Sequence, residues 1–225
     1  MQKEFYEHSL YPLQDRVLEI VNECNTPFYL TGGTALSRYY LHHRYSDDLD
    51  FFVNHEENFT SYVSLIIKRL KTNFEVNLSI TDTDFARLFI VSKDVELKIE
   101  FINDVFYHFG ALNTFNGHRI DNPLNMLANK ITALSRNAAK DYADILYLSF
   151  HYPFNWIDIF NAAKEKDTWV NEVSAAEILN VFDVDKLSEV NWIEPMDTTV
   201  FDSKYSTIAR DILMGADNSL YPTVL

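Results

Sequence analysis

The sequence predicts an α+β fold, in which a domain that combines helices with a mixed sheet is followed by a helical domain. Up to about residue 110, segments with apolar side chains at helical spacing alternate with short β-rich runs, an order that an α/β domain would also show. Gly110, Gly117 and Pro123 cluster where this pattern ends, and helical periodicity dominates beyond them. We therefore expect the first domain to span residues 1–115 and the helical domain to span residues 116–225.

The elements of the first domain follow from two periodicities. Its helices repeat buried side chains every three to four residues, and its strands are rich in β-branched and aromatic residues. Turns are expected at Asp82-Thr83-Asp84 and at Lys93-Asp94. In chain order we expect a helix over 10–24, a strand over 28–31, a helix over 34–43, a strand over 49–53, a helix over 59–70, and strands over 74–80, 86–92 and 95–102.

Composition and charge exclude several classes of protein. The 225 residues are 47% hydrophobic and carry a formal net charge of −14, which argues against disorder and against broad non-specific binding to polyanions. Residues 161–225 hold 5 basic against 12 acidic residues, so a basic patch is expected only before them. The single cysteine, Cys24, excludes an intrachain disulfide. Because the N-terminus is unlike a leader and no apolar run reaches 18 residues, we expect a soluble, cytoplasmic protein with no membrane partner.

The most informative motif couples a Gly-Gly turn to an Asp-x-Asp pair. Gly32 and Gly33 expose backbone N–H groups where a phosphate can approach without a Cβ in the way. Asp48 and Asp50 stand at the start of a strand, where residues two apart point to the same side. Mg²⁺ takes a few carboxylates and completes its octahedron with water and substrate phosphates. The motif therefore indicates metal-assisted chemistry on a nucleoside triphosphate; the alternative is a solvated turn that caps a neighbouring element.

A third acid is expected from another strand of the sheet. Glu100 is flanked by alternating large apolar residues and can lie beside Asp48 and Asp50. Two Mg²⁺ ions held by these three carboxylates would lower the pKa of an attacking hydroxyl and neutralise the leaving pyrophosphate. In a second interpretation, Glu100 is the base that takes the proton from that hydroxyl. The alternative to both is a simple ion pair, because Lys98 shares the face of Glu100.

One long helix is expected from Leu124 to about Phe150, with shorter helices through residue 214 and breaks at Pro153 and Pro195. The long helix carries a cluster of ionisable residues, namely Lys130, Arg136, Lys140, Asp141 and Asp144. On a continuous helix, positions 130, 141 and 144 fall within about 60° of one another beside an apolar stripe. Lys130 and Lys140 are then candidate donors to the triphosphate, whereas the alternative is a solvated face with ion pairs between residues four apart.

Other kinds of catalytic site find no support in the sequence. The seven histidines lack the spacing of a zinc site. A Ser-His-Asp order, a G-x-S-x-G elbow, a Walker A loop and a G-x-G-x-x-G fingerprint are all missing from the sequence.

The motifs closely resemble those of the AbiEii/AbiGii toxin family of nucleotidyltransferases, which belongs to the DNA polymerase β-like superfamily. The resemblance begins with Gly32-Gly33-Thr34-Ala35-Leu36, followed by Arg44-x-Ser46-x-Asp48-Leu49-Asp50-Phe51. It continues with the helical motif from Ala128-x-Lys130 to Lys140-Asp141-x-x-Asp144, so that the two motifs span residues 32–144. Glu100 departs from the superfamily pattern, in which many enzymes use Asp, but its longer side chain still reaches a metal.

The resemblance implies a polymerase β-like nucleotidyltransferase domain with a mixed sheet, a helical C-terminal domain, and a nucleotide in the cleft between them. Asp48, Asp50 and Glu100 would hold a two-metal Mg²⁺ site and act in catalysis. Asp141 would be a further catalytic or structural acid. The residues expected to bind the NTP substrate are Gly32, Gly33, Thr34, Ser46, Lys130 and Lys140.

The resemblance also implies partners. Members of the family are toxins of toxin–antitoxin or phage-defence loci, so a separate antitoxin protein is expected. Some members add nucleotides to the tRNA 3′ end, which makes RNA the expected acceptor. A small molecule or a protein is the alternative acceptor, since the chain is acidic. A catalytically silent, partner-binding protein of the same fold is the remaining alternative, and the intact acidic motif counts against it.

Overall fold

The computed structural model describes residues 2–93 and 95–223, which form two compact units. Unit 1 comprises the chain up to Ala35, Tyr45–Phe106 and Leu112–Asp121. Unit 2 comprises Leu36–Arg44, Tyr107–Ala111 and the chain from Asn122 on. The polypeptide therefore crosses between the units five times, whereas a single boundary after residue 115 was expected from the sequence.

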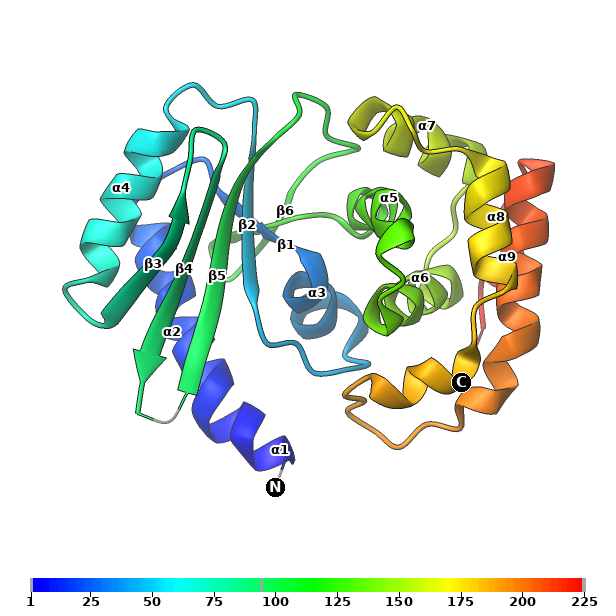
Figure 1. The fold of residues 1–225 in the computed structure, drawn as a ribbon, viewed down its shortest axis with the longest axis horizontal. Helices are drawn as coiled ribbons and strands as arrows, with labels where there is room; N and C mark the ends of the chain where they lie inside the picture. Colours follow the sequence, from blue (N-terminus) through cyan, green and yellow to red (C-terminus); the bar gives the residue numbers. More distant parts are fainter. Residues whose placement is uncertain (1, 94, 224–225) are drawn as a thin grey trace. The chain divides into compact units, whose positions relative to one another are not determined.

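Unit 1 is built on a mixed sheet of seven strands in the order β3-β4-β5-β2-β1-β7-β6 (Figure 1). The strands are β1 (Tyr29–Thr31), β2 (Leu49–Asn54), β3 (Glu75–Thr81), β4 (Phe85–Ser92), β5 (Val95–Asp104), β6 (Asn113–Phe115) and β7 (His118–Ile120). Strand β2 runs parallel to β5 and antiparallel to β1. This arrangement confirms the predicted α+β class with a mixed sheet.

Unit 1 also contains helices beside this sheet. They are α1 (Gln2–Phe5), the π-helical turn η1 (Tyr6–Leu10), α2 (Tyr11–Glu23), the short α3 (Gly32–Ala35) and α4 (Phe59–Leu70). Helices α2 and α4 contact each other and lie on the same side of the sheet (Figure 1). The odd-numbered residues of β2 and of the middle of β5 are buried in the core, while their even-numbered neighbours are only half-buried. The second face of the sheet is therefore free to carry polar side chains.

The described part of unit 2 consists of helices joined by loops, with two isolated β-bridges. Its helices are η2 (Leu36–Leu41, π-helical), α5 (Pro123–Ala133), the 3₁₀ turn η3 (Leu134–Arg136), α6 (Ala139–His151), α7 (Trp156–Lys166), α8 (Glu172–Asn180), the 3₁₀ turns η4 (Val184–Glu189) and η5 (Thr198–Phe201), and α9 (Asp202–Met214). Helix α6 is the centre of this unit, since all but two of its 13 residues are buried. Across residues 2–93 and 95–223, no helix combines the length and the apolar character needed to cross a membrane.

Two predictions about the elements were wrong. The single helix expected over 124–150 is two helices, because Asn137 adopts a left-handed conformation (φ 51°) and Ala138 is extended. The hairpin β6–β7 was missed, because its strands are only three residues long and bury a single side chain, Ile120. Of the two predicted turns, Lys93 has a positive φ of 54°, while Asp94 lies outside the described residues.

Candidate functional site

The acidic residues of the first motif lie on the half-buried face of the unit 1 sheet. Asp48 directly precedes β2, and Asp50 is the second residue of that strand. Glu100 is the register partner of Asp50 on the adjacent parallel strand β5. Because side chains alternate along both strands, the three carboxylates share one face. This juxtaposition is the one expected from the sequence.

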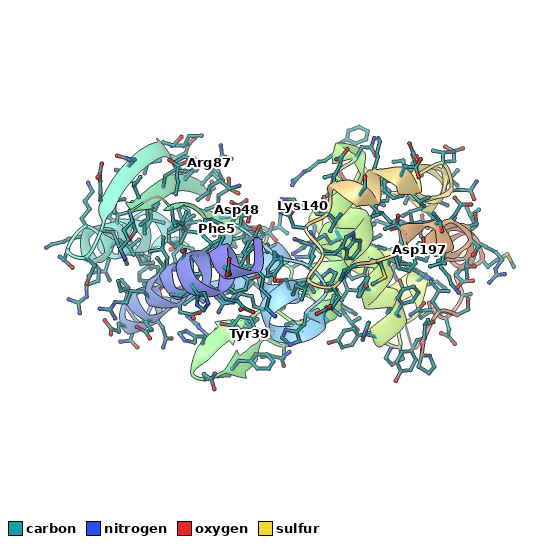
Figure 2. All side chains as sticks on the ribbon, turned by 90° about the horizontal axis from the view of Figure 1, so that it is seen from below. Phe5, Tyr39, Asp48, Arg87, Lys140 and Asp197 are labelled. Atoms are coloured by element: carbon teal, nitrogen blue, oxygen red, sulfur yellow. The ribbon has the colours of Figure 1, made fainter. Side chains whose placement is uncertain are left out.

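Two cations of the same unit neutralise this acidic face. Lys98 Nζ lies 2.9 Å from Asp48 Oδ2 and 3.6 Å from Glu100 Oε1. On the other side, Arg87 of β4 donates to Glu100 Oε1 at 2.6 Å. Figure 2 labels Asp48 and Arg87 among the side chains of unit 1. Burial alone would lower the pKa of the Lys98 ammonium, but the hydrogen bond and charge of Asp48, with the charges of Glu100 and Asp50, raise it above its usual value.

The Gly-Gly turn lies against the second carboxylate of the motif. Gly32 follows β1 with a φ of +71°, which L side chains rarely adopt, and a Cβ built on it would lie 2.5 Å from Asp50 Oδ2. Thr34 is buried, and its hydroxyl donates a hydrogen bond to the main-chain oxygen of Asp48. A glycine at position 32 is therefore required both by the backbone conformation and by the close approach of Asp50.

The loop before β2 is fixed by the N-terminal helices. Gln14 Nε2 donates to the main-chain oxygens of Ser46 and Asp47, each at 3.1 Å. The Tyr6 hydroxyl donates to Asp47 Oδ1 at 2.5 Å, and its ring stacks on Tyr45 with centroids 4.1 Å apart. Ser46 is itself buried. These contacts hold the backbone that carries Asp48, while the role of the Ser46 side chain in nucleotide binding stays a prediction.

The donor set on this face suits a hard divalent cation such as Mg²⁺. Three carboxylates come from adjacent positions of two paired strands, and the missing Cβ of Gly32 permits the close approach of the Asp50 carboxylate. Within residues 2–93 and 95–223, however, no three acidic, histidine or cysteine side chains already form a metal-binding group. Lys98 bridges two of the carboxylates instead. The residues fit the ion by chemistry and position, and Lys98 has to move before all three can contact it.

The residues of the second motif form a buried ion network in unit 2. Asp144 is fully buried and accepts hydrogen bonds from His43 Nε2 (2.8 Å) and from Arg44 Nε and Nη2 (2.7 and 2.8 Å). Lys130 of α5 lies 2.7 Å from Asp144 Oδ2 and 2.6 Å from Asp141 Oδ1. Helices α5 and α6 therefore bring these side chains together by packing, although the continuous helix that was expected to align them is absent.

The network shifts the pKa values of its members in a consistent way. Burial lowers the pKa of His43 below its usual value, and the hydrogen bond to Asp144 offsets this only partly. Burial would raise the pKa of the Asp144 carboxyl, but Arg44 and Lys130 hold it well below its usual range. Burial would lower the pKa of Lys130, and the two aspartates raise it instead. The stable state is therefore a neutral His43 beside two cations and two carboxylates.

The two lysines proposed as triphosphate donors lie in different surroundings. Lys130 is buried and its ammonium is engaged by two carboxylates. Lys140, by contrast, is exposed at the start of α6 and forms no ion pair with any residue that the structure describes (Figure 2). A role for Lys130, Lys140 and Asp141 in nucleotide binding or catalysis stays a prediction, with Lys140 the accessible donor.

Several residues of these clusters were not predicted as site residues. Arg87 is the register partner of the predicted Glu100. Both lie six residues from the expected turn at Lys93-Asp94, so the turn already contained the signal for their pairing. His43 is adjacent to the motif arginine Arg44 and had no such signal, since its partner lies 101 residues away.

Comparisons with known proteins identify the family of the chain and proteins of similar fold. Residues 16–215 match the family model described as "Nucleotidyl transferase AbiEii toxin, Type IV TA system". The crystal structure of JHP933 from Helicobacter pylori is similar, with 22% identity, a TM-score of 0.58, and coverage of 88% of this chain and 89% of that one. The crystal structure of a "putative nucleotidyltransferase from H. pylori" is similar too, with 22% identity, a TM-score of 0.59, and coverage of 88% and 92%. A comparison with curated proteins finds no match. At this level of identity, the two crystal structures show a shared fold.

Proposed function

Because the chain belongs to the AbiEii family of nucleotidyl transferase toxins, we propose that it moves a nucleoside monophosphate from an NTP to a hydroxyl of RNA, at the tRNA 3′ end, in a Mg²⁺-dependent reaction. The protein is a nucleotidyltransferase of a type IV toxin–antitoxin family, so an antitoxin and an NTP are its implied partners. The magnesium ion, the RNA acceptor and the residue roles are the proposed part.

The observation that carries the proposal is the shared face of Asp48, Asp50 and Glu100. The register of β2 and β5 places Glu100 directly beside Asp50, and the alternation of side chains places Asp48 on the same side. When bound, Mg²⁺ lowers the pKa of an attacking hydroxyl and neutralises charge on the leaving pyrophosphate. The three carboxylates are the groups of this chain that would hold it.

The remaining residues of the motif would bind and orient the triphosphate. Gly32 and Gly33 would offer backbone N–H groups to a phosphate, while at Gly32 the place of a Cβ is taken by the Asp50 carboxylate. Thr34 fixes the main chain at Asp48 through its hydroxyl. Lys140 is an exposed ammonium that can neutralise phosphate charge.

An RNA acceptor is compatible with the uneven charge of the chain. Residues 161–225 are strongly acidic, whereas 14 of the 19 basic residues precede them. Arg136 and Lys140 are exposed on either side of the α5–α6 break. Such local cations can contact an RNA backbone even though the net charge of −14 disfavours polyanions in general.

The test is to incubate the purified protein with Mg²⁺, each α-labelled NTP in turn and total tRNA. Asp48→Asn is the inactive variant. Asp47→Asn is its matched control, because Asp47 is exposed, asparagine keeps the Oδ1 that accepts the Tyr6 hydrogen bond, and the same chemical change is made one residue away. We expect label on RNA with the unmutated protein and with Asp47→Asn, and none with Asp48→Asn.

Two results would contradict the proposal in different ways. Full activity of Asp48→Asn would remove the metal assignment. Label on the protein itself, or transfer only to small-molecule hydroxyls, would overturn the RNA acceptor while leaving the nucleotidyltransferase chemistry intact.

A further inference from the structure

Lys98 places its ammonium among the carboxylates that the proposed function assigns to the metal. Its Nζ bridges Asp48 Oδ2 at 2.9 Å and Glu100 Oε1 at 3.6 Å, and the negative charge of Asp50 stabilises the same ammonium. We infer that Lys98 is a placeholder cation: it balances the three acids in the metal-free protein and is displaced when a divalent ion enters. This inference rests on the proposed metal site at Asp48, Asp50 and Glu100.

The position of Lys98 follows from the strand geometry. Lys98 and Glu100 are two residues apart on β5 and therefore point to the same face, and position 99 pairs with position 49 on β2. Lys98 thus stands beside Asp48 in the same way that Glu100 stands beside Asp50. An ammonium and a divalent cation seek the same carboxylate oxygens, so their binding there is competitive.

The side chain of Lys98 is also suited to leave. It is 29% exposed, and a flexible four-carbon stem lets the ammonium swing into solvent while the backbone stays in the sheet. Arg87 differs, because its planar guanidinium is held on Glu100 Oε1 by Nε and Nη2 alike, and no ion pair to Asp48 or Asp50 is found among the described residues. Metal entry therefore exchanges one cation for another at Asp48, while Arg87 keeps its contact with Glu100.

Competition of this kind predicts the sign of a mutational effect. Removing the charge of Lys98 leaves the acids intact but removes the competing cation, so the divalent ion binds more tightly. Lys98→Met keeps most of the apolar stem and removes the ammonium. Lys98→Arg keeps a cation at the position and should behave like the unmutated protein.

The experiment is a calorimetric titration of the full chain with Mn²⁺ alone, without nucleotide or acceptor. We expect Lys98→Met to bind Mn²⁺ at least about tenfold more tightly than the unmutated protein, a change of about 1.4 kcal/mol. Lys68→Met is the matched control for net charge, because Lys68 is an exposed lysine on α4 of the same unit. This control should leave the Mn²⁺ affinity nearly unchanged. Thermal unfolding with and without Mn²⁺ supplies a second readout and checks that each variant folds.

Asp50→Asn separates failure of this inference from failure of the metal site. If Asp50→Asn loses Mn²⁺ binding while Lys98→Met binds as the unmutated protein does, or more weakly, the metal site stands and the placeholder role is overturned. If Asp50→Asn binds Mn²⁺ normally, or if neither the unmutated protein nor Lys98→Met binds it, the metal site itself is wrong and the inference fails with it.

Discussion

Replacing Asp144 by Asn should destabilise unit 2 strongly, because this carboxylate is the centre of the buried ion network. Its side chain is fully buried, accepts hydrogen bonds from His43 and Arg44 at 2.7–2.8 Å, and forms an ion pair with Lys130 at 2.7 Å. Asparagine has nearly the same shape but no charge. Any loss of stability therefore reports the lost charge and the lost hydrogen-bond acceptor rather than a cavity.

The magnitude follows from the charge balance of the network. With His43 neutral, Arg44 and Lys130 are balanced by Asp141 and Asp144, and the variant leaves two cations with one carboxylate. Breaking a buried ion pair by removing one partner costs about 3–5 kcal/mol, because the remaining charge has lost its water and its counter-ion. Since the free energy of unfolding of a domain is only about 5–15 kcal/mol, a substantial part of the stability would be lost.

The assay is urea unfolding at neutral pH, followed by circular dichroism and by tryptophan fluorescence, to which Trp192 contributes with its ring 6.4 Å from that of His43. Asp141→Asn is the matched control: its carboxylate contacts Lys130 at the edge of the network and is slightly exposed, so the loss should be smaller. A loss below about 1 kcal/mol for Asp144→Asn, the value of an exposed pair, would refute the role given to this residue. An equal loss in both variants would do the same.

Two further predictions concern backbone fit and pH. Gly32→Ala should lower both the free energy of unfolding and the Mn²⁺ affinity, because its Cβ would displace Asp50 Oδ2. Gly117→Ala is the control: with a φ of +83° and open space around its Cβ, it should lose only about 1 kcal/mol of stability through backbone strain. Equal effects of the two variants would exclude the contact with Asp50. Burial holds the pKa of His43 below 6.5, so below pH 6.5 His43 binds a proton in the unfolded chain but not in the folded chain. The free energy of unfolding should therefore fall with decreasing pH, by up to about 1.4 kcal/mol per pH unit, until the pKa of folded His43 is reached. In denaturant titrations from pH 7 to pH 5, His43→Gln should flatten this fall, and an unchanged slope would assign the effect to another group.

Side-chain periodicity was sufficient to predict much of unit 1. The helix Phe59–Leu70 has the expected bounds, and the strands of the central sheet differ by one or two residues from those expected. The same alternation was sufficient to predict that Glu100 shares a face with Asp50, because a strand residue can lie on only one of the two faces of a sheet.

Features that depend on single backbone conformations or on distant partners could not be predicted in this way. Asn137 ends a helix by adopting a left-handed conformation, which its neighbours in sequence do not reveal. The partner of His43 and Arg44 lies about 100 residues away, and only the packing of α5 against α6 decides that Lys130 meets it. Whether Lys98 bridges Asp48 or stays in solvent depends on a flexible side chain and not on the strand pattern.

The repeated passage of the chain between its two units limits how this protein can be dissected. A fragment of residues 1–115 would carry His43 and Arg44 but not Asp144, and the remainder would keep that acid without them. Each piece would therefore expose groups that the intact protein buries, and neither should fold well when produced alone. We therefore expect a split chain to regain its fold only when both pieces are made in the same cell.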